Sequence, residues 1–120
     1  MKYLCYTLGT ETDAIPAPSP DMMAEMGDFV AEAMASGKLI ATGGVAPIAQ
    51  AFRVRYDAGE FTVTDGPFSE AKELVGGWAL IDVPTRAEAE EMAKRFLRIA
   101  GGGESTIRPS FGPDDDFPMR

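Results

Sequence analysis

The chain has 120 residues, 45% of them hydrophobic and 25% charged, which is the size and composition of a single globular domain. Its formal net charge is −8 and it has no basic patch, so direct binding to nucleic acid or to an anionic membrane is not expected. The apolar run near the N-terminus is too short for a signal peptide, and no stretch reaches the ~20 apolar residues of a membrane span. A cytoplasmic location is therefore expected.

The chain begins with a predicted strand and a predicted helix. Lys2 to Leu8 is rich in β-forming residues, and within it the chain's single cysteine, Cys5, is expected to be a small buried residue. Ser19 and Pro20 are typical of a helix start, and Gly37 is typical of a helix end. Apolar residues recur at helical spacing between them: Met22, Met26, Phe29, Val30, Ala33 and Met34.

A strand and a hairpin are predicted next. Leu39 to Val45 has the composition of a second strand. Ala51 to Tyr56 and Glu60 to Thr64 alternate apolar with polar residues on either side of a short turn around Gly59. This pattern predicts a hairpin with one apolar face and one polar face.

The second half of the chain predicts a strand, a helix and a last strand. Gly76 to Val83 and Ser105 to Phe111 are the strands, and Thr85 with Glu88 forms a capping box for the helix between them. The helix has an apolar stripe: Ala89, Met92, Ala93, Phe96, Leu97 and Ala100. Its outer face predicts ion pairs of Glu90 with Lys94 and of Glu91 with Arg95. Residues 112–120 are expected to be an acidic, flexible tail after a domain of residues 1–111.

Without the hairpin, the predicted order is strand, helix, strand, strand, helix, strand. That order is the ferredoxin-like split βαβ pattern, an α+β fold, here with an inserted β-hairpin. With both helices on one face of the sheet, the other face is left bare. An apolar sheet face usually has a partner, and a homodimer formed by sheet-to-sheet packing would cover it.

The stretch from Asp65 to Glu73 is the most informative part of the sequence. Asp65 and Gly66 are typical of a turn. Pro67 then restricts the backbone after the turn, and Phe68 is expected to be buried and to anchor it. A structural corner accounts for these features but leaves the charged residues after them, Glu70, Lys72 and Glu73, unexplained. Two carboxylates and an ammonium group in a desolvated cleft suit proton transfer on a small polar substrate, whereas solvated loop charges are the alternative.

The same stretch carries a family resemblance. Asp65-Gly66-Pro67-Phe68 resembles the DGPF signature of the YCII-related family, Met1-Lys2-Tyr3-Leu4 resembles its opening strand, and Ile107-Arg108-Pro109 its closing strand. The resemblance implies a dimeric α+β barrel. In the wider family a His–Asp pair is the proposed catalytic feature, and this chain contains no histidine. Members of the DGPF branch occur beside or fused to alternative sigma factors, which implies a regulatory role as an alternative to catalysis.

Two hypotheses follow for function. In the first, the chain binds or transforms a small polar molecule in a dimer cleft, with catalytic groups Asp65, Lys72 and Glu73 and with substrate-binding residues Gly66, Pro67, Phe68, Glu70, Trp78 and Arg108. In the second, it is a non-catalytic interaction module linked to sigma-factor-dependent transcription. Three arginines, Arg53, Arg55 and Arg108, fit either a small anion site or solvent-facing strand positions. Neither a metal nor a cofactor is expected, because histidine is absent and carboxylates lack a ligand-loop spacing.

Overall fold

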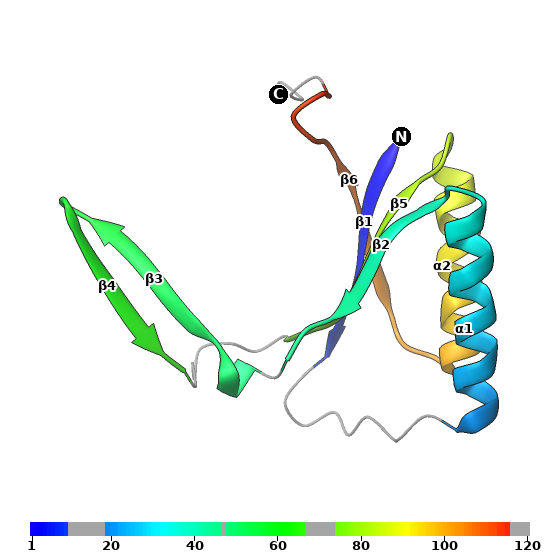
Figure 1. Ribbon diagram of the computed structural model, residues 1–120, viewed down its shortest axis with the longest axis horizontal. Coiled ribbons are helices and arrows are strands. Elements are labelled where there is room, and N and C mark those ends of the chain that lie inside the picture. Colours follow the sequence, from blue (N-terminus) through cyan, green and yellow to red (C-terminus); the bar gives the residue numbers. More distant parts are fainter. Residues whose placement is uncertain (10–18, 47, 67–73, 116–120) are drawn as a thin grey trace.

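The computed structural model describes residues 1–9, 19–46, 48–66 and 74–115 of the chain. These residues form six strands, two α-helices and a short 3-10 helix (Figure 1). In chain order they are β1 (Lys2–Gly9), α1 (Pro20–Ala35), β2 (Leu39–Gly44), η1 (Ile48–Gln50), β3 (Phe52–Asp57), β4 (Glu60–Asp65), β5 (Leu74–Asp82), α2 (Arg86–Ala100) and β6 (Ser105–Ser110).

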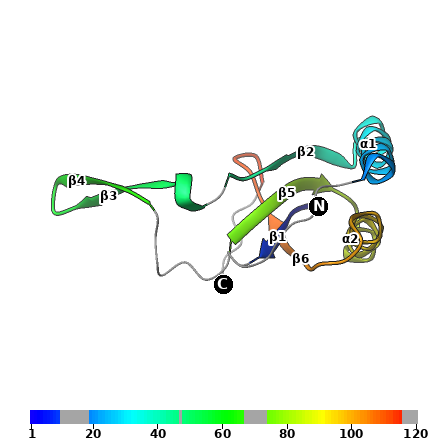
Figure 2. The same cartoon turned by 90° about the horizontal axis from the view of Figure 1, so that it is seen from below.

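The main sheet has four strands in the order β2-β5-β1-β6, and every neighbouring pair is antiparallel. Both helices lie on one face of this sheet, as the two perpendicular views agree (Figures 1 and 2). The outer strands are β2 and β6, and β6 contains Pro109. This arrangement confirms the predicted ferredoxin-like α+β fold. The pairing of two copies stays a prediction.

The core lies between the helices and the main sheet. Side chains on a strand alternate between the two faces, so Tyr3, Leu39 and Ile81 all point toward the helices. They pack with residues of both helices in a cluster of buried side chains: Tyr3, Ala33, Leu39, Ile81, Val83 and Ala89. Cys5 is half-buried against this cluster, and burial raises the pKa of its thiol. Cys5, predicted to be a small buried residue, thus packs against the core but is only partly buried.

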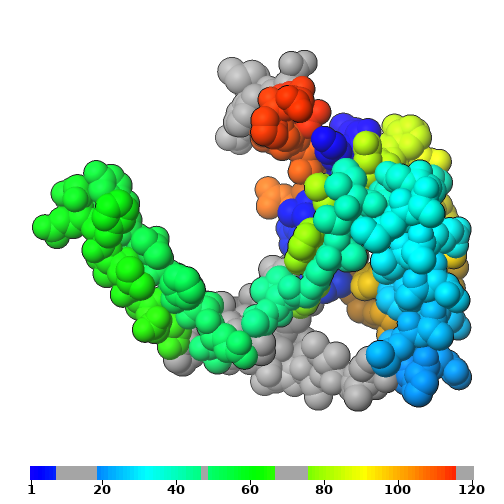
Figure 3. Space-filling view, in the orientation of Figure 1, coloured from blue at the N-terminus to red at the C-terminus, as the bar shows by residue number. Residues whose placement is uncertain are grey.

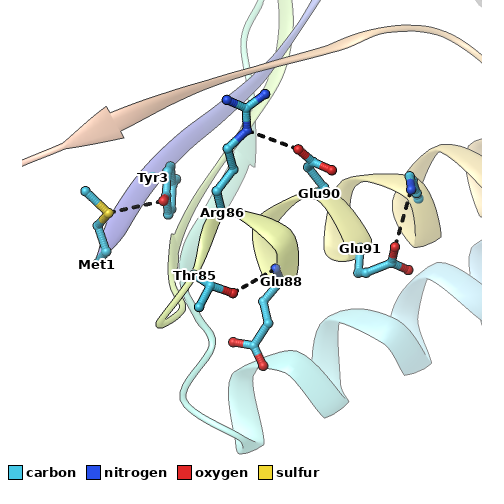
Figure 4. A network of polar contacts seen from close by, with 8 residues as sticks. Met1, Tyr3, Thr85, Arg86, Glu88, Glu90 and Glu91 are labelled. Carbon is cyan, nitrogen blue, oxygen red and sulfur yellow. Dashed lines mark hydrogen bonds and ion pairs between the residues drawn. The ribbon is translucent and has the colours of Figure 1, made fainter.

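The helix ends follow the capping signals. The Ser19 hydroxyl accepts a hydrogen bond from the Met22 amide at 3.1 Å, and the Thr85 hydroxyl accepts one from the Glu88 amide at 3.2 Å (Figure 4). Gly101 ends α2 with a left-handed φ of 86°. Only half of the predicted capping box forms, because Glu88 Oε2 is buried and has no hydrogen-bond partner among the described residues.

The predicted ion pairs on α2 are wrong in their partners. Glu90 accepts a hydrogen bond from Arg86 at 3.0 Å, one turn earlier, and Glu91 pairs with Lys94 at 3.3 Å (Figure 4). Arg95 therefore forms no ion pair with Glu91 of its own helix. Spacing along one helix cannot distinguish among these choices, because acids and bases stand at several suitable separations.

Arg95 instead joins the two helices. Its guanidinium group donates two hydrogen bonds to the Glu32 carboxylate, at 3.1 and 2.7 Å, and its Cζ lies 4.9 Å from the centroid of the Phe29 ring. The hydrogen bonds from Arg95 lower the pKa of Glu32. Since the folded-state pKa is lowered, the pair stabilises the fold at neutral pH, and this contribution is lost as the pH falls through the folded-state pKa.

Arg95→Met is expected to raise the pKa of Glu32 toward its ordinary value, because the charge-assisted hydrogen bonds are removed. A carboxyl-detected NMR titration of the folded protein measures this change. Arg98→Met is the matched control, since it removes a cation from the same helix face without a contact to Glu32. If Glu32 titrates identically in both variants, the pair does not form in solution.

The hairpin of β3 and β4 forms a separate two-stranded sheet that projects away from the main sheet (Figures 1 and 2). Its turn places two consecutive residues at positive φ, Ala58 at 52° and Gly59 at 82°. Two such residues define the turn that matches the natural twist of a hairpin. After β4, the Gly66 amide still donates to the Ala51 carbonyl at 2.8 Å, so the ladder continues past Asp65.

The chain after β6 makes a turn beside the N-terminus. The Gly112 amide donates to Asp115 Oδ2 at 2.6 Å, which lowers the pKa of Asp115, and Lys2 Nζ lies 3.7 Å from the same oxygen. The first part of the predicted tail is thus attached to β1. Residues 116–120 lie outside the described residues, and the domain boundary after residue 111 stays a prediction.

Candidate functional site

The face of the main sheet opposite the helices carries apolar and aromatic side chains. Because Tyr3 and Cys5 point toward the helices, alternation places Leu4 and Tyr6 on the other side of β1. We call this surface the open face. It comprises Leu4, Tyr6, Trp78, Leu80, Thr106 and Arg108, and none of these is fully buried.

Trp78 lies near the middle of the open face. It is opposite Tyr6 of β1 on one side and opposite Gly43 of β2 on the other. A Cβ added to Gly43 would lie 3.2 Å from Trp78 Cζ2 and Nε1, so the indole ring lies over the bare backbone of β2. Glycine at position 43 therefore lets the ring lie flat across the strand.

Arg108 occupies the neighbouring row of the same face. It is opposite Leu4, which is in turn opposite Leu80, while Thr106 is opposite Tyr6. Arg108 is exposed, as is Leu4 opposite it, whereas Leu80 beyond Leu4 is half-buried. A cation next to an apolar surface is well suited to bind an anionic group, because a guanidinium forms two parallel hydrogen bonds with a carboxylate or phosphate.

The structure brings together only part of the predicted site. Trp78 and Arg108 share the open face, whereas Asp65 and Gly66 end the hairpin, which is a different sheet. Asp65 is exposed, opposite Phe52. The other predicted site residues lie outside the described residues: Pro67, Phe68, Glu70, Lys72 and Glu73.

Four residues of the open face were not among the predicted site residues: Leu4, Tyr6, Leu80 and Thr106. Alternation within Lys2 to Leu8 and within Gly76 to Val83 divides each strand into two faces. The signal was therefore present. What the sequence lacks is the order β2-β5-β1-β6, which decides which strands are neighbours and which side chains stand in one row.

A cavity lies on the other side of the sheet, between the sheet and the helices. Its volume is about 180 Å³, and it lies at the end of the layer where α1 begins and α2 ends. Its lining is mainly apolar and includes Cys5, Met26, Phe29, Val30, Met92 and Phe96. Tyr6 and Trp78, whose side chains strand alternation assigns to the open face, also contribute to the lining. Its described lining residues include no aspartate, glutamate, lysine or arginine, so the cavity is better suited to an apolar group than to a charged substrate.

The described part of the chain offers neither a metal site nor a membrane-spanning helix. Its histidine, cysteine, aspartate and glutamate residues form no group of three or more that would hold a metal ion. Among the described residues, no helix is long and apolar enough to cross a membrane. The open face is thus the main candidate site within these residues.

Comparison with known proteins adds a family relationship. The model of the YCII-related domain matches residues 1–107, which include every described helix and the first half of β6. An uncharacterized protein of Rhizobium meliloti (strain 1021) is 33% identical over 108 residues, which are 88% of this chain and 87% of that protein. The matched region contains both Trp78 and all of the stretch from Asp65 to Glu73.

Proposed function

Because the chain belongs to the YCII-related domain family, we propose that it is a cytoplasmic homodimer in which the open faces of two copies enclose a binding cleft. The cleft binds a small molecule that combines a flat apolar part with an anionic group. The observation that carries this proposal is that Trp78 and Arg108 share one uncovered sheet face. The run Asp65-Gly66-Pro67-Phe68 supports placing the chain in the DGPF branch of the family.

The stretch from Asp65 to Glu73 supplies the polar groups in this proposal. It connects β4 with β5, and β5 carries Trp78. A segment that joins the hairpin to the central strand of the open face is suited to form one end of the cleft. Asp65, Lys72 and Glu73 then act on the bound molecule as proton donors and acceptors.

Arg108→Gln is expected to weaken binding of a small aromatic anion by about tenfold or more, because a hydrogen bond to a charged group contributes about 1.5–3 kcal/mol. Trp78 is the single tryptophan of the chain, so its fluorescence reports directly on this face. The probes are benzoate and phenyl phosphate, with benzyl alcohol as the uncharged match. Titrations of Trp78 fluorescence give the three affinities for each protein.

Arg98→Gln is the control variant, because it removes an exposed cation of α2 on the opposite side of the sheet. It is expected to bind the probes like the unchanged protein. The proposal fails if the unchanged protein binds benzyl alcohol as well as benzoate and phenyl phosphate. It also fails if Arg108→Gln and Arg98→Gln behave alike.

The second candidate is a non-catalytic interaction module connected with sigma-factor-dependent transcription. The projecting hairpin supports it, because β3 and β4 expose large apolar side chains, as proteins that act through their surface often do. This candidate is preferred if none of the three probes changes Trp78 fluorescence and the chain binds a sigma factor in a direct assay with purified proteins.

A further inference from the structure

The hairpin of β3 and β4 has an apolar face that the rest of the chain leaves exposed. Val54 is opposite Val63, and Tyr56 is opposite Phe61, with ring centroids 4.9 Å apart. Phe52 completes this face. All five side chains are 60–73% exposed. The opposite face of the hairpin carries arginines and threonines, so the hairpin is amphipathic although it covers no core.

Such a hairpin needs a second layer. A two-stranded sheet is at best marginally stable in water on its own, and an apolar patch of this kind usually marks an interface. The main sheet of the same chain cannot provide the layer in this arrangement, because the hairpin leans away from it and an open hollow separates the two (Figures 1 and 3). The open face of that sheet is itself uncovered.

We propose that the apolar face of the hairpin of one copy packs on the open face of a second copy, and forms the outer wall of the partner's binding cleft. The inference rests on the dimer of the proposed function. Each chain offers one projecting apolar face and one receiving apolar face, so a two-fold axis covers both at once. A closed pair of this kind leaves neither of these two faces available to a third copy.

The area of the apolar face is sufficient for a stable pair. An aromatic side chain carries about 150–250 Å². At 66–73% exposure, Phe52, Tyr56 and Phe61 together offer on the order of 300–500 Å². Two hairpins and the two sheet surfaces that they cover then bury on the order of 1,200–2,000 Å², the range of specific stable interfaces.

The polar face of the hairpin agrees with this orientation. Arg55 is opposite Thr62, and its guanidinium lies 4.0 Å from Asp57, with both side chains more than 75% exposed. These groups stay in water when the other face docks. Burying the polar face instead would remove Arg55 and Asp57 from solvent, which is unfavourable without compensating partners.

Cross-linking between two tagged copies tests the inference. Both copies carry Cys5→Ala, which removes the single natural thiol. One copy then carries Val63→Cys on the hairpin, and the other carries Leu4→Cys on the open face. The two are co-expressed with different affinity tags and treated with a short bifunctional maleimide. A cross-linked species that contains one copy of each tag is the expected result.

Thr62→Cys in place of Val63→Cys is the matched control, because the adjacent residue lies on the polar face of the same strand. It is expected to give a several-fold lower yield of the mixed species. Equal yields from positions 62 and 63 would overturn the inference. So would a Leu4→Cys, Val63→Cys double variant that cross-links within one chain, since the hairpin would then lie on its own sheet.

Two measurements on the unchanged protein, whose open face carries no substitution, separate this inference from the proposed function. Sedimentation velocity gives its mass, and Trp78 fluorescence with phenyl phosphate reports on the cleft. If the unchanged protein is a dimer that binds the probe but Val63→Cys gives no cross-link, only the hairpin arrangement is overturned. A monomer at micromolar concentration would overturn the dimer and the hairpin arrangement together. If Val63→Cys gives the cross-link but the unchanged dimer does not respond to the probe, the arrangement is supported and the proposed ligand is contradicted.

Discussion

Ile81→Ala is expected to lower the free energy of unfolding by about 2–5 kcal/mol, because it removes a buried aliphatic side chain and leaves a cavity. Ile81 is only 3% exposed and belongs to the buried cluster beneath the helices. It lies on β5, which pairs with both β1 and β2, so a void there loosens the centre of the sheet. Urea-induced unfolding with linear extrapolation measures the change.

Ile40→Ala is the matched control for this substitution. The side chain is the same, but Ile40 is 43% exposed on β2, at the edge of the main sheet. Because less of the Ile40 side chain is buried on folding, its truncation is expected to lower the free energy of unfolding clearly less than Ile81→Ala does. Comparable losses at the two positions would mean that the layer between sheet and helices is not the core of the folded protein.

Phe29→Ala is expected to lower the free energy of unfolding by about 3–5 kcal/mol, the usual result for a buried phenylalanine. Phe29 is 8% exposed on α1, between the sheet and the guanidinium group of Arg95. Its loss removes apolar packing and also the ring over which Arg95 is held. The measurement is again denaturant unfolding, followed by far-ultraviolet circular dichroism.

Phe96→Ala provides the comparison on α2. Phe96 is half-buried and lines the cavity of about 180 Å³, so its ring has fewer neighbours to lose. A loss smaller than that of Phe29→Ala is expected. The sequence places Phe96 on the apolar stripe of its helix, but a stripe does not show that the layer beneath is filled. A larger loss for Phe96→Ala would contradict the presence of the cavity.

The elements of the fold were predictable because local signals define them. The capping residues act on backbone groups within one helical turn, so the sequence alone predicts their effect. They are Ser19 before α1, Thr85 before α2 and Gly101 after α2. Alternation in β3 and β4 likewise predicted the hairpin and its two faces. The order of elements then indicated the ferredoxin-like arrangement, since few topologies accommodate it.

Contacts between distant segments were harder to predict. Arg95 pairs with Glu32 across 63 residues, and its apparent partner at helical spacing, Glu91, binds Lys94 instead. The outward direction of the hairpin is a second example. The apolar face of the hairpin predicted that another layer of protein packs on it. The alternation of apolar and polar residues around Val54 and Phe61 is the same whether that layer belongs to this chain or to another.

The candidate site was predictable in part. The side-chain chemistry of Trp78 and Arg108 made them candidates for the site, and the sheet register places them on one face. The charges from Glu70 to Glu73 remain a prediction, because they lie outside the described residues. We expect Asp65 to stabilise the turn that follows β4 by about 1 kcal/mol, if its carboxylate accepts backbone hydrogen bonds as a helix cap does. Its exposed position at the end of β4 leaves the carboxylate accessible to water.

Pro109 has a consequence for how this protein behaves when it is concentrated. It lies in β6, at one margin of the main sheet, and a proline has no N–H with which to bond an added strand. Addition of a strand from another copy to β6, which would begin a cross-β fibril, is therefore disfavoured. Copies of the chain meet instead through the other outer strand, β2, or through the faces of the sheets.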